Sequence, residues 1–342
     1  MKVAVIGATG AVGRAMTELL EERNFPVDAF VPLASARNAG RRTSFRGEEH
    51  EIRELTVEAA RGADVAFVSA GASTSRTFLP DIAANGTVCI DNSSAFRMDP
   101  DVPLAVPHVN PDALQGWPKP GIIAVPNCTT IAAVLALGPL HRAAGLTNLV
   151  LSSYQSVSGA GHKGVSELLE QVEKLRGAEE DLSHPDHGAL PAGDVMGKTI
   201  AYNVVATIGE FEPDGFTGEE SKMMAEPRKI LGTPELPVVA TSVRVPTVVG
   251  HGVSILAEFT RPISPDEARE LLRNAPGVEL RDDPANGVYP SPLDSAGLDV
   301  ALVGRIRQVP GRGDALALFS CADNLRIGAA LDAVLIAEHL FS

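Results

Sequence analysis

The chain has 342 residues, of which 44% are hydrophobic, so it can bury a large core and form two domains. It carries 29 basic and 43 acidic residues, a formal net charge of −14, and this excess of negative charge disfavours nucleic acid as a partner. No apolar run is long enough to span a membrane and the first residues lack a signal-peptide pattern, so we expect a cytoplasmic protein with no membrane partner.

The N-terminal segment predicts a strand, a glycine-rich turn and a helix. Residues 2–6 form a β-branched apolar run, residues 15–20 have a helical pattern, and the glycines between them are spaced G-x-x-G-x-x-G. Glycines at such a turn let backbone N–H groups approach a phosphate, and the helix N-terminus adds partial positive charge. A tight turn without a ligand is the alternative for a lone match. The cofactor-binding residues expected here are Gly7, Thr9, Gly10, Ala11, Val12 and Gly13.

The end of the second predicted strand indicates which dinucleotide would bind. This strand lies near residues 27–33 and is followed by Ser35 and Arg37. A site for NAD usually has an acidic residue at this place, where it holds the ribose 2′-hydroxyl. A hydroxyl and a guanidinium suit a 2′-phosphate instead, so we expect NADP. A solvated loop arginine is the alternative interpretation of Arg37.

Two further strands are predicted at residues 64–69 and 87–91, with a helical stretch around residues 78–84 between them. Repeated βα units predict an α/β fold with a Rossmann-type, doubly wound parallel sheet that binds ligands at its carboxyl edge. Ser69 and Gly71 lie at the end of the first of these strands and are therefore expected to contact the cofactor.

Cys128 follows an apolar run at residues 122–125 and precedes a helix-forming run that starts at Ile131. At a helix N-terminus the unpaired N–H groups and the dipole favour thiolate over thiol, as a cysteine nucleophile requires. Cys89 and Cys321 lie in buried-looking strands as small hydrophobic residues, and Cys128 taken alone could be the same. Three widely spaced cysteines suit neither a disulfide framework nor a closed zinc site, so we expect a reducing compartment and no metal.

Short motifs are spread over nearly the whole chain. They are residues 7–13 (GATGAVG), 91–97 (DNSSAFR), 126–130 (PNCTT), 154–161 (YQSVSGAG), 219–222 (EESK), 244–246 (RVP), 250–251 (GH) and 323–325 (DNL). In order and separation they resemble the aspartate-semialdehyde dehydrogenase family. The resemblance implies a homodimer or homotetramer that reduces L-aspartyl 4-phosphate to L-aspartate 4-semialdehyde with NADPH, a step in lysine, threonine and methionine biosynthesis.

The same resemblance implies catalytic roles for three residues. Cys128 resembles the nucleophile that expels phosphate and forms a thioester, which hydride then resolves. His251 resembles the general acid/base, for which we expect an unperturbed pKa near neutrality. Gln155 resembles the residue that positions the substrate or the tetrahedral intermediate. Outside the family, His251 would be interpreted as a structural imidazole and Gln155 as an ordinary polar strand end.

Substrate-binding roles also follow from the resemblance. Arg244 resembles the clamp on the substrate carboxylate, and Glu219 resembles the partner of the substrate amino group. Arg97, Asn127 and Lys222 resemble the group that binds phosphate. Without the resemblance, Glu219 and Lys222 would be a surface ion pair and Arg97 a surface charge. The family pattern adds three cofactor-binding residues, Ser158, Gly159 and Asn324.

The second half of the chain predicts an α+β catalytic and dimerisation domain with a mixed sheet. We expect antiparallel strands around residues 238–245, 253–259, 300–307 and 316–320. The segment 325–340 has apolar residues at helical spacing and would pack back on the nucleotide domain. The expected division is therefore residues 1–127 plus 325–342 for NADP binding and residues 128–324 for catalysis and dimerisation.

Other interpretations stay open. A different acyl-phosphate reductase, such as N-acetyl-glutamyl-phosphate reductase or a glyceraldehyde-phosphate dehydrogenase, uses the same thioester chemistry, although its cysteine surroundings differ from PNCTT. A catalytically silent nucleotide-binding regulator would need none of four residues that this chain has together, so the presence of all four argues against it. The four are Cys128, Gln155, Arg244 and His251. A metal site made of His184, Asp186 and His187 is disfavoured, because a proline-containing solvated loop explains that composition.

Overall fold

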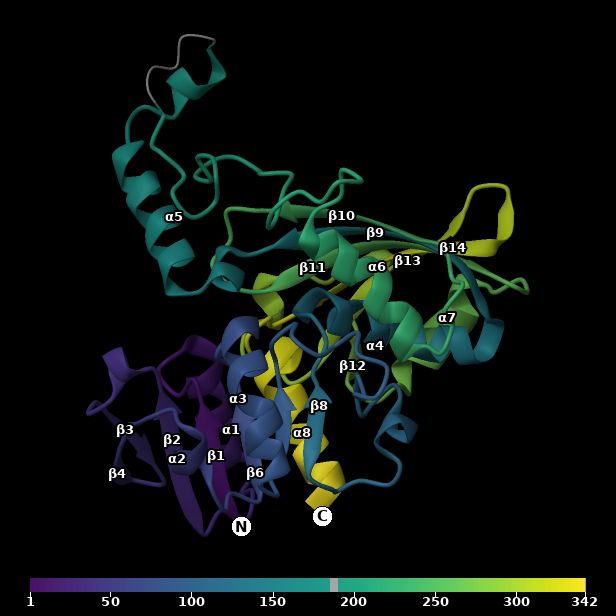
Figure 1. Ribbon diagram of the computed structural model, residues 1–342. Coiled ribbons are helices and arrows are strands. Elements are labelled where there is room, and N and C mark those ends of the chain that lie inside the picture. The colour runs from purple at the N-terminus through teal and green to yellow at the C-terminus, as the bar shows by residue number, and fades with distance from the viewer. Residues whose placement is uncertain (185–189, 342) are drawn as a thin grey trace.

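The computed structural model describes residues 1–184 and 190–341, and within these ranges it contains two six-stranded sheets and one small hairpin (Figure 1). The first sheet has the strand order β5-β2-β1-β6-β7-β8, and all neighbouring strands are parallel. This confirms the expected Rossmann-type sheet. Its strands are β1 Lys2–Ile6, β2 Ala29–Ala34, β5 Arg53–Glu54, β6 Val65–Val68, β7 Val88–Asp91 and β8 Gly121–Ala124.

The strand order of this sheet reverses at β1. The chain passes from β1 outward to β2 and β5, then returns to β6 on the other side of β1. The carboxyl ends of β1 and β6 therefore flank the switch point, where open α/β sheets bind their ligands. The backbone N–H of Ser69 donates to the carbonyl oxygen of Ile6 at 2.8 Å, so the two strand ends are close together.

Alternating side chains give the parallel sheet two apolar faces. On β1, Val3 and Val5 pack into the core that contains α1 and α8, whereas Ala4 and Ile6 pack into the core that contains α2 and α3. Helices therefore cover both faces, as a doubly wound sheet requires (Figure 1). These helices are α1 Ala11–Glu22, α2 Val57–Ala60, α3 Ala72–Ala84 and α8 Leu331–Phe341.

The C-terminal segment returns to this first sheet. It begins as a π-helical turn, Arg326–Ala330, and continues as α8, which packs against α1, β6 and β7. A Cβ atom added at Gly328 would lie 3.2 Å from the Cβ of Cys128. The returning segment therefore runs directly beside Cys128 and also packs against the first sheet.

The second sheet is mixed, with the order β10-β9-β11-β14-β13-β12. The antiparallel arrangement is confirmed for β11, β13 and β14 but is wrong for β10, which pairs in parallel with β9. The long connection between β9 and β10 contains α5 and α6 and allows the crossover that a parallel pair requires. The strands are β9 Leu146–Gln155, β10 Val238–Arg244, β11 His251–Phe259, β12 Val278–Leu280, β13 Ala301–Val309 and β14 Arg312–Ala322.

One face of the mixed sheet is covered by helices α4 (Cys128–Ala144), α6 (Gly218–Ile230) and α7 (Pro265–Arg273) (Figure 1). Helix α4 is apolar on nearly all sides and buried along most of its length, as a helix with that pattern must be. It contacts the mixed sheet and also the π-helical turn. Its N-terminus therefore lies where the two sheets meet.

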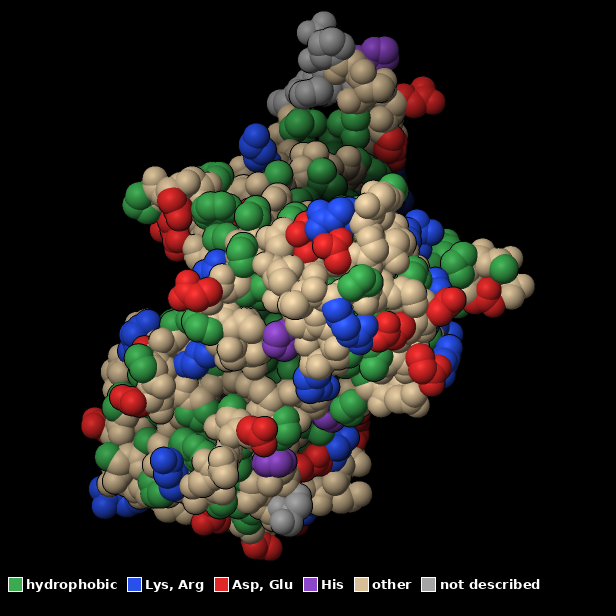
Figure 2. Space-filling view, turned by 90° about the vertical axis from the view of Figure 1, so that its right-hand side faces the viewer, with side chains coloured by type: hydrophobic (Ala, Val, Ile, Leu, Met, Phe, Trp, Pro, Cys, Tyr) green, Lys and Arg blue, Asp and Glu red, His purple; other side chains and the backbone are tan. Residues whose placement is uncertain are grey.

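The remaining elements lie at the periphery. Helix α5 (His162–Lys174) projects away from the sheets on its own small core, and β3 (Arg42–Phe45) pairs with β4 (Glu48–Glu51) (Figure 1). Within residues 1–184 and 190–341, no helix is long and apolar enough to cross a membrane. On the face that Figure 2 shows, basic and acidic side chains of the described residues are interspersed, without a continuous basic surface.

Candidate active site

The turn after β1 is packed so closely that glycine is required at two positions. Gly7 has φ +88°, and a Cβ atom there would lie 2.2 Å from the carbonyl oxygen of Ser69. A Cβ atom at Gly13 would lie 2.2 Å from the carbonyl oxygen of Gly7. Gly10 caps α1 without any side-chain hydrogen bond, so the first N–H groups of the helix remain for a ligand. These features fit a bound pyrophosphate.

A cavity of about 450 Å³ lies over this turn. Of the predicted cofactor-binding residues, Gly7, Thr9, Gly10, Ser35 and Ser69 line it. Four further polar or aromatic residues of the wall were not predicted from the sequence. One of them, Asn38, directly follows Arg37 and donates from Nδ2 to Thr9 Oγ1 at 3.1 Å. The four are Asn38, Glu54, Thr74 and Phe78.

Three predicted cofactor-binding residues line neither this cavity nor the two cavities beside Cys128 described below. Gly13 lies behind the turn, where it lets α1 pack against Gly7. Arg37 is exposed in a short 3-10 helix after β2, beyond the cavity wall. Gly71 is the N-cap of α3 with φ +82°, and a Cβ atom there would meet no other atom. Their spacing in the sequence predicts the loops correctly but not which side chains reach the cavity.

Cys128 is the first residue of α4, as the sequence predicts. Asn127 caps the helix, because its Oδ1 accepts the backbone N–H groups of Thr129 at 2.9 Å and Thr130 at 3.3 Å. The predicted stabilisation of the thiolate by the helix N-terminus is present through the Thr129 N–H but is outweighed in the free protein. Burial and the charge of Glu219 raise the pKa of Cys128 to about 12, against the opposing effects of two arginines and the Thr129 N–H.

Cys128 lies at the junction of two cavities, which distinguishes it from the fully buried Cys89 and Cys321. One cavity, of about 280 Å³, is also lined by Ser69, so it continues from the cavity over the glycine turn. The predicted cofactor-binding residues on its wall are Ala11, Val12, Ser69, Ser158, Gly159 and Asn324.

The other cavity has a volume of about 750 Å³ and is strongly charged. The two cavities meet at Cys128. The four residues that line both of them are Arg97, Asn127, Cys128 and Gly159. Gln155 lines this charged cavity, as do all five residues predicted to bind substrate. The five are Arg97, Asn127, Glu219, Lys222 and Arg244.

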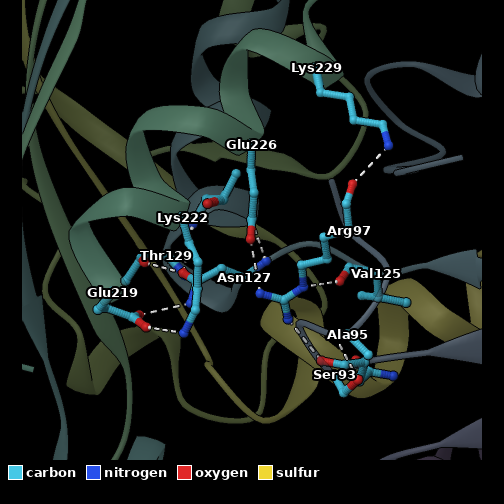
Figure 3. A network of polar contacts seen from close by, with 12 residues as sticks. Ser93, Ala95, Arg97, Val125, Asn127, Thr129, Glu219, Lys222, Glu226 and Lys229 are labelled. Carbon is cyan, nitrogen blue, oxygen red and sulfur yellow. Dashed lines mark hydrogen bonds and ion pairs between the residues drawn. The ribbon is translucent and has the colours of Figure 1, made fainter. Parts of the chain in front are cut away.

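Glu219 accepts several hydrogen bonds in the charged cavity, and Figure 3 shows it beside Asn127 and Lys222. Its Oε1 accepts from Asn127 Nδ2 at 2.8 Å and from Gln155 Nε2 at 3.1 Å, and its Oε2 accepts from Lys222 Nζ at 3.1 Å. Burial opposes ionisation of Glu219, but the charge of Lys222 and these hydrogen bonds lower its pKa below the usual value. Glu219 therefore presents a buried negative charge near Cys128.

The mixed sheet places Arg244, Gln155 and His251 in one row. Gln155 is the register partner of Arg244 on β10 and of His251 on β11, and partners on neighbouring strands point to the same face. A Cβ atom added at Gly159 would lie 2.8 Å from Arg244 Nη1 and 3.1 Å from His251 Nε2. The space over Gly159, beside Cys128, is therefore bordered by a guanidinium and an imidazole.

His251 differs from its predicted state. Burial and the charge of Arg244 lower its pKa to about 3, so the expectation of an unperturbed pKa is wrong. The backbone N–H of Ser156 donates to Nδ1 at 3.1 Å, which leaves the proton of the neutral ring on Nε2. Nε2 is buried and has no partner among the described residues. The ring is thus set to donate a hydrogen bond from Nε2.

Within the described residues, no group of three histidine, cysteine or acidic side chains is arranged to hold a metal ion. His184 is exposed, whereas Asp186 and His187 lie outside the described residues. The buried acid Glu226, which pairs with Arg97 at 3.0 Å, was missed by sequence analysis. Its spacing of seven residues from Glu219 on one helix was the available signal.

Comparisons with known proteins point to one family. Residues 2–117 match the family model for the semialdehyde dehydrogenase NAD binding domain, and residues 137–327 match the model for the dimerisation domain. The aspartate-semialdehyde dehydrogenase of Aquifex aeolicus is 46% identical over 340 residues, covering 99% of this chain and 97% of the relative. That of Mycolicibacterium smegmatis is 48% identical over 348 residues, covering 99% of both chains.

Solved structures have the same fold. Aspartate semialdehyde dehydrogenase II from Vibrio cholerae, complexed with ASA, has a TM-score of 0.90 and 38% identity, covering 99% of this chain and 97% of the other. The Candida albicans enzyme with NADP has a TM-score of 0.72 and 25% identity, covering 99% and 98%.

Proposed function

The chain belongs to the aspartate-semialdehyde dehydrogenase family, and we propose that it reduces L-aspartyl 4-phosphate to L-aspartate 4-semialdehyde through a thioester on Cys128. The observation that carries the proposal is that Cys128 borders both the cavity leading from the glycine turn and the charged cavity. A nucleophile at that junction can meet a nicotinamide from one side and an acyl phosphate from the other. The step belongs to lysine, threonine and methionine biosynthesis.

NADPH supplies the hydride when it is bound. The uncapped N-terminus of α1 and the close packing at Gly7 support pyrophosphate binding, and Ser35 supports contacts to the adenosine end. Arg37 lies between Ala36 and Asn38, which both line the cavity, so its charge could attract a 2′-phosphate. Ser158, Gly159 and Asn324 would hold the nicotinamide end, because they line the cavity beside Cys128.

The charges in the larger cavity match those of the substrate. Arg244 binds the α-carboxylate with its planar fork, and Glu219 accepts from the ammonium group. Lys222 and Arg97 bind the phosphate together with Asn127, whose amide has one N–H left after its bond to Glu219. The ammonium group also neutralises Glu219 and so removes one of the two causes that raise the pKa of Cys128.

The reaction then proceeds through two displacements at one carbon. The Cys128 thiolate attacks the acyl carbon, the C–O bond to phosphate breaks, and phosphate leaves and takes up a proton. Hydride adds to the thioester, and the resulting oxyanion receives a hydrogen bond from His251 Nε2–H and is positioned by Gln155. Collapse breaks the C–S bond, which releases the aldehyde and regenerates the thiolate.

The reverse reaction tests this proposal. Aspartate semialdehyde and NADP should give nicotinamide absorbance only when phosphate is present, because phosphate must release the acyl group from Cys128. Activity only with N-acetylglutamate semialdehyde or glyceraldehyde 3-phosphate would select another acyl-phosphate reductase. Binding of NADP without turnover of any aldehyde would instead indicate a nucleotide-binding regulator.

We also infer a homodimer formed through the mixed sheet. The face opposite α4 carries exposed apolar side chains on β9 and β10: Val150 is 40%, Tyr154 40% and Val239 51% exposed. A sheet face of this kind is suited to pairing with a second copy. Light scattering after gel filtration should give a dimer mass, and Val239→Asp should reduce it to that of a monomer. A mass of four chains would favour the tetramer.

Two further assignments accompany the proposed function. We infer that residues 1–127 plus 325–342 form the NADP-binding domain and residues 128–324 the catalytic and dimerisation domain, which the packing of α8 on β6 and β7 supports. We infer a reducing cytoplasmic location from the three free cysteines. Tagged protein in a fractionated cell tests the location.

A further inference from the structure

Helix α6 presents one stripe of charged side chains toward the Cys128 region. Glu219, Lys222, Glu226 and Lys229 are separated by three, four and three residues, so they lie on the same side of the helix. Figure 3 shows all four pointing toward the loops that hold Arg97 and Asn127. The first two line the charged cavity, whereas the last two contact loops of the nucleotide-binding sheet.

Glu226 uses both carboxylate oxygens on residues of the proposed phosphate site. Oε1 accepts from Arg97 Nη1 at 3.0 Å, and Oε2 accepts from the backbone N–H of Asn127 at 2.7 Å. Both side chains of the ion pair are buried, with exposures of 1% for Glu226 and 8% for Arg97. Arg97 also donates from Nε to the carbonyl oxygen of Val125 and from Nη2 to that of Asn92, each at 2.8 Å.

The same helix holds the backbone around Arg97. Lys229 Nζ donates to the carbonyl oxygens of Arg97, Asp99 and Val102, each at 2.8 Å. Lys229 therefore fixes the loop and Glu226 fixes the guanidinium. Among the described residues three of the five N–H groups of Arg97 have partners, so two remain for the oxygens of a ligand.

We infer that Glu226 is a positioning residue for phosphate. It acts through the guanidinium of Arg97 and through the backbone N–H of Asn127. Two backbone carbonyl oxygens hold Nε and Nη2 of Arg97, and the Glu226 carboxylate holds Nη1 at 3.0 Å, so the guanidinium is kept in one orientation. Glu219 holds the side-chain amide of Asn127 while Glu226 holds its backbone N–H, so one helix fixes both ends of the residue beside the nucleophile. This inference rests on the proposed function of Arg97.

The experiment compares Glu226→Gln with the wild type in the phosphate-dependent reduction of NADP. Glutamine keeps the shape of the side chain but loses its charge. One of the two carboxylate oxygens is replaced by an NH2 group, which cannot accept the hydrogen bond from Arg97 or from the Asn127 N–H. We expect the KM for phosphate to rise at least about tenfold, while the KM for NADP changes by less than about twofold. The matched control is Glu220→Gln, because Glu220 is buried on the same helix but caps it at Thr217 and binds the Ser242 N–H.

A double-mutant cycle with Arg97→Gln separates positioning from a general structural role. Because Glu226 acts mainly through Arg97, the rise in phosphate KM of the double variant should be well below the product of the two single rises. The part of the rise beyond that of Arg97→Gln alone would come from the contact of Glu226 with the Asn127 N–H. Multiplied effects, or an equal rise of KM for phosphate, aldehyde and NADP, would overturn the inference. Should Glu226→Gln be insoluble, Glu226→Asp, which withdraws the carboxylate by one methylene, gives the same comparison. Failure of the wild type to require phosphate would overturn the proposed function itself.

Discussion

The glycine turn and the cysteine site are assembled in different ways. Gly7, Gly10 and Gly13 lie within one turn of chain, and each is explained by a backbone contact, with Ser69 for Gly7 and with Gly7 for Gly13, or by the start of α1. The cysteine site joins the start of α4 to three strand ends and to α6, which are far apart in the sequence. The first region therefore depends on backbone shape, whereas the second depends on which charges meet in a buried space.

Replacing the sulfur should produce the largest effect, because it should abolish turnover at the cysteine site and leave NADP binding at the glycine turn unchanged. Cys128→Ser should lower kcat by at least about a thousandfold, because a serine hydroxyl does not ionise at neutral pH without a stronger base. NADP binding, measured by fluorescence titration, should stay close to that of the wild type. Cys321→Ser is the control, since Cys321 lies in β14 away from both cavities. Turnover by Cys128→Ser near the wild-type rate would remove the proposed nucleophile.

A methyl group at Gly159 should damage the chemistry without unfolding the chain. The added Cβ would lie 2.8 Å from Arg244 Nη1 and 3.1 Å from His251 Nε2, so both polar groups must shift. We expect kcat/KM for the aldehyde to fall about a hundredfold, the size associated with misplaced catalytic groups. Gly10→Ala is the matched change in the other region, where the nearest atom is the Gly7 carbonyl oxygen at 3.3 Å. It should mainly raise the KM for NADP.

The pH dependence of alkylation tests the electrostatics of the cysteine site. Burial and Glu219 raise the pKa of Cys128 to about 12, so the thiolate fraction of the free enzyme should grow about tenfold per pH unit below that value. Iodoacetamide should therefore label Cys128 faster at each step from about pH 6 to about pH 9. No step should occur near the ordinary imidazole pKa, because burial and Arg244 lower the pKa of His251 to about 3.

Glu219→Gln supplies the control for that profile. It removes the negative charge, which is the second cause of the raised pKa of Cys128, and keeps the size of the side chain. Labelling at a given pH should therefore be faster in the variant. A labelling rate that levels off below about pH 8 in the wild type would contradict the raised pKa.

These tests also mark what can be predicted from a sequence. The parallel sheet, the glycine turn and the helical position of Cys128 follow from local patterns, and the structure confirms them. The pKa values of Cys128 and His251 could not be predicted, because burial and the charges of Glu219 and Arg244 act only after folding. The parallel pairing of β10 was missed because strand patterns do not contain direction.

Some residues of the candidate site could be predicted from the sequence, and others could not. Motifs predicted five substrate-binding residues that all line the charged cavity, since family resemblance carries information about distant contacts. Glu226 was missed because its spacing of seven residues from Glu219 places it on the same helix face but does not show that this face is buried. Its burial and its contacts with Arg97 and Asn127 exist only in three dimensions.

The smallest expected effect concerns Arg37, which the sequence associates with NADP and the structure leaves exposed. Arg37→Glu should weaken NADP binding about fivefold at low salt and leave NAD nearly unchanged, because only NADP has a 2′-phosphate for the new charge to repel. The effect should shrink as salt is added, since an exposed charge is screened. Arg41→Glu makes the same charge change at another exposed position. An equal loss from both variants would assign the effect to net charge, whereas a loss specific to Arg37→Glu would show that the glycine-turn region also uses a side chain beyond its cavity wall.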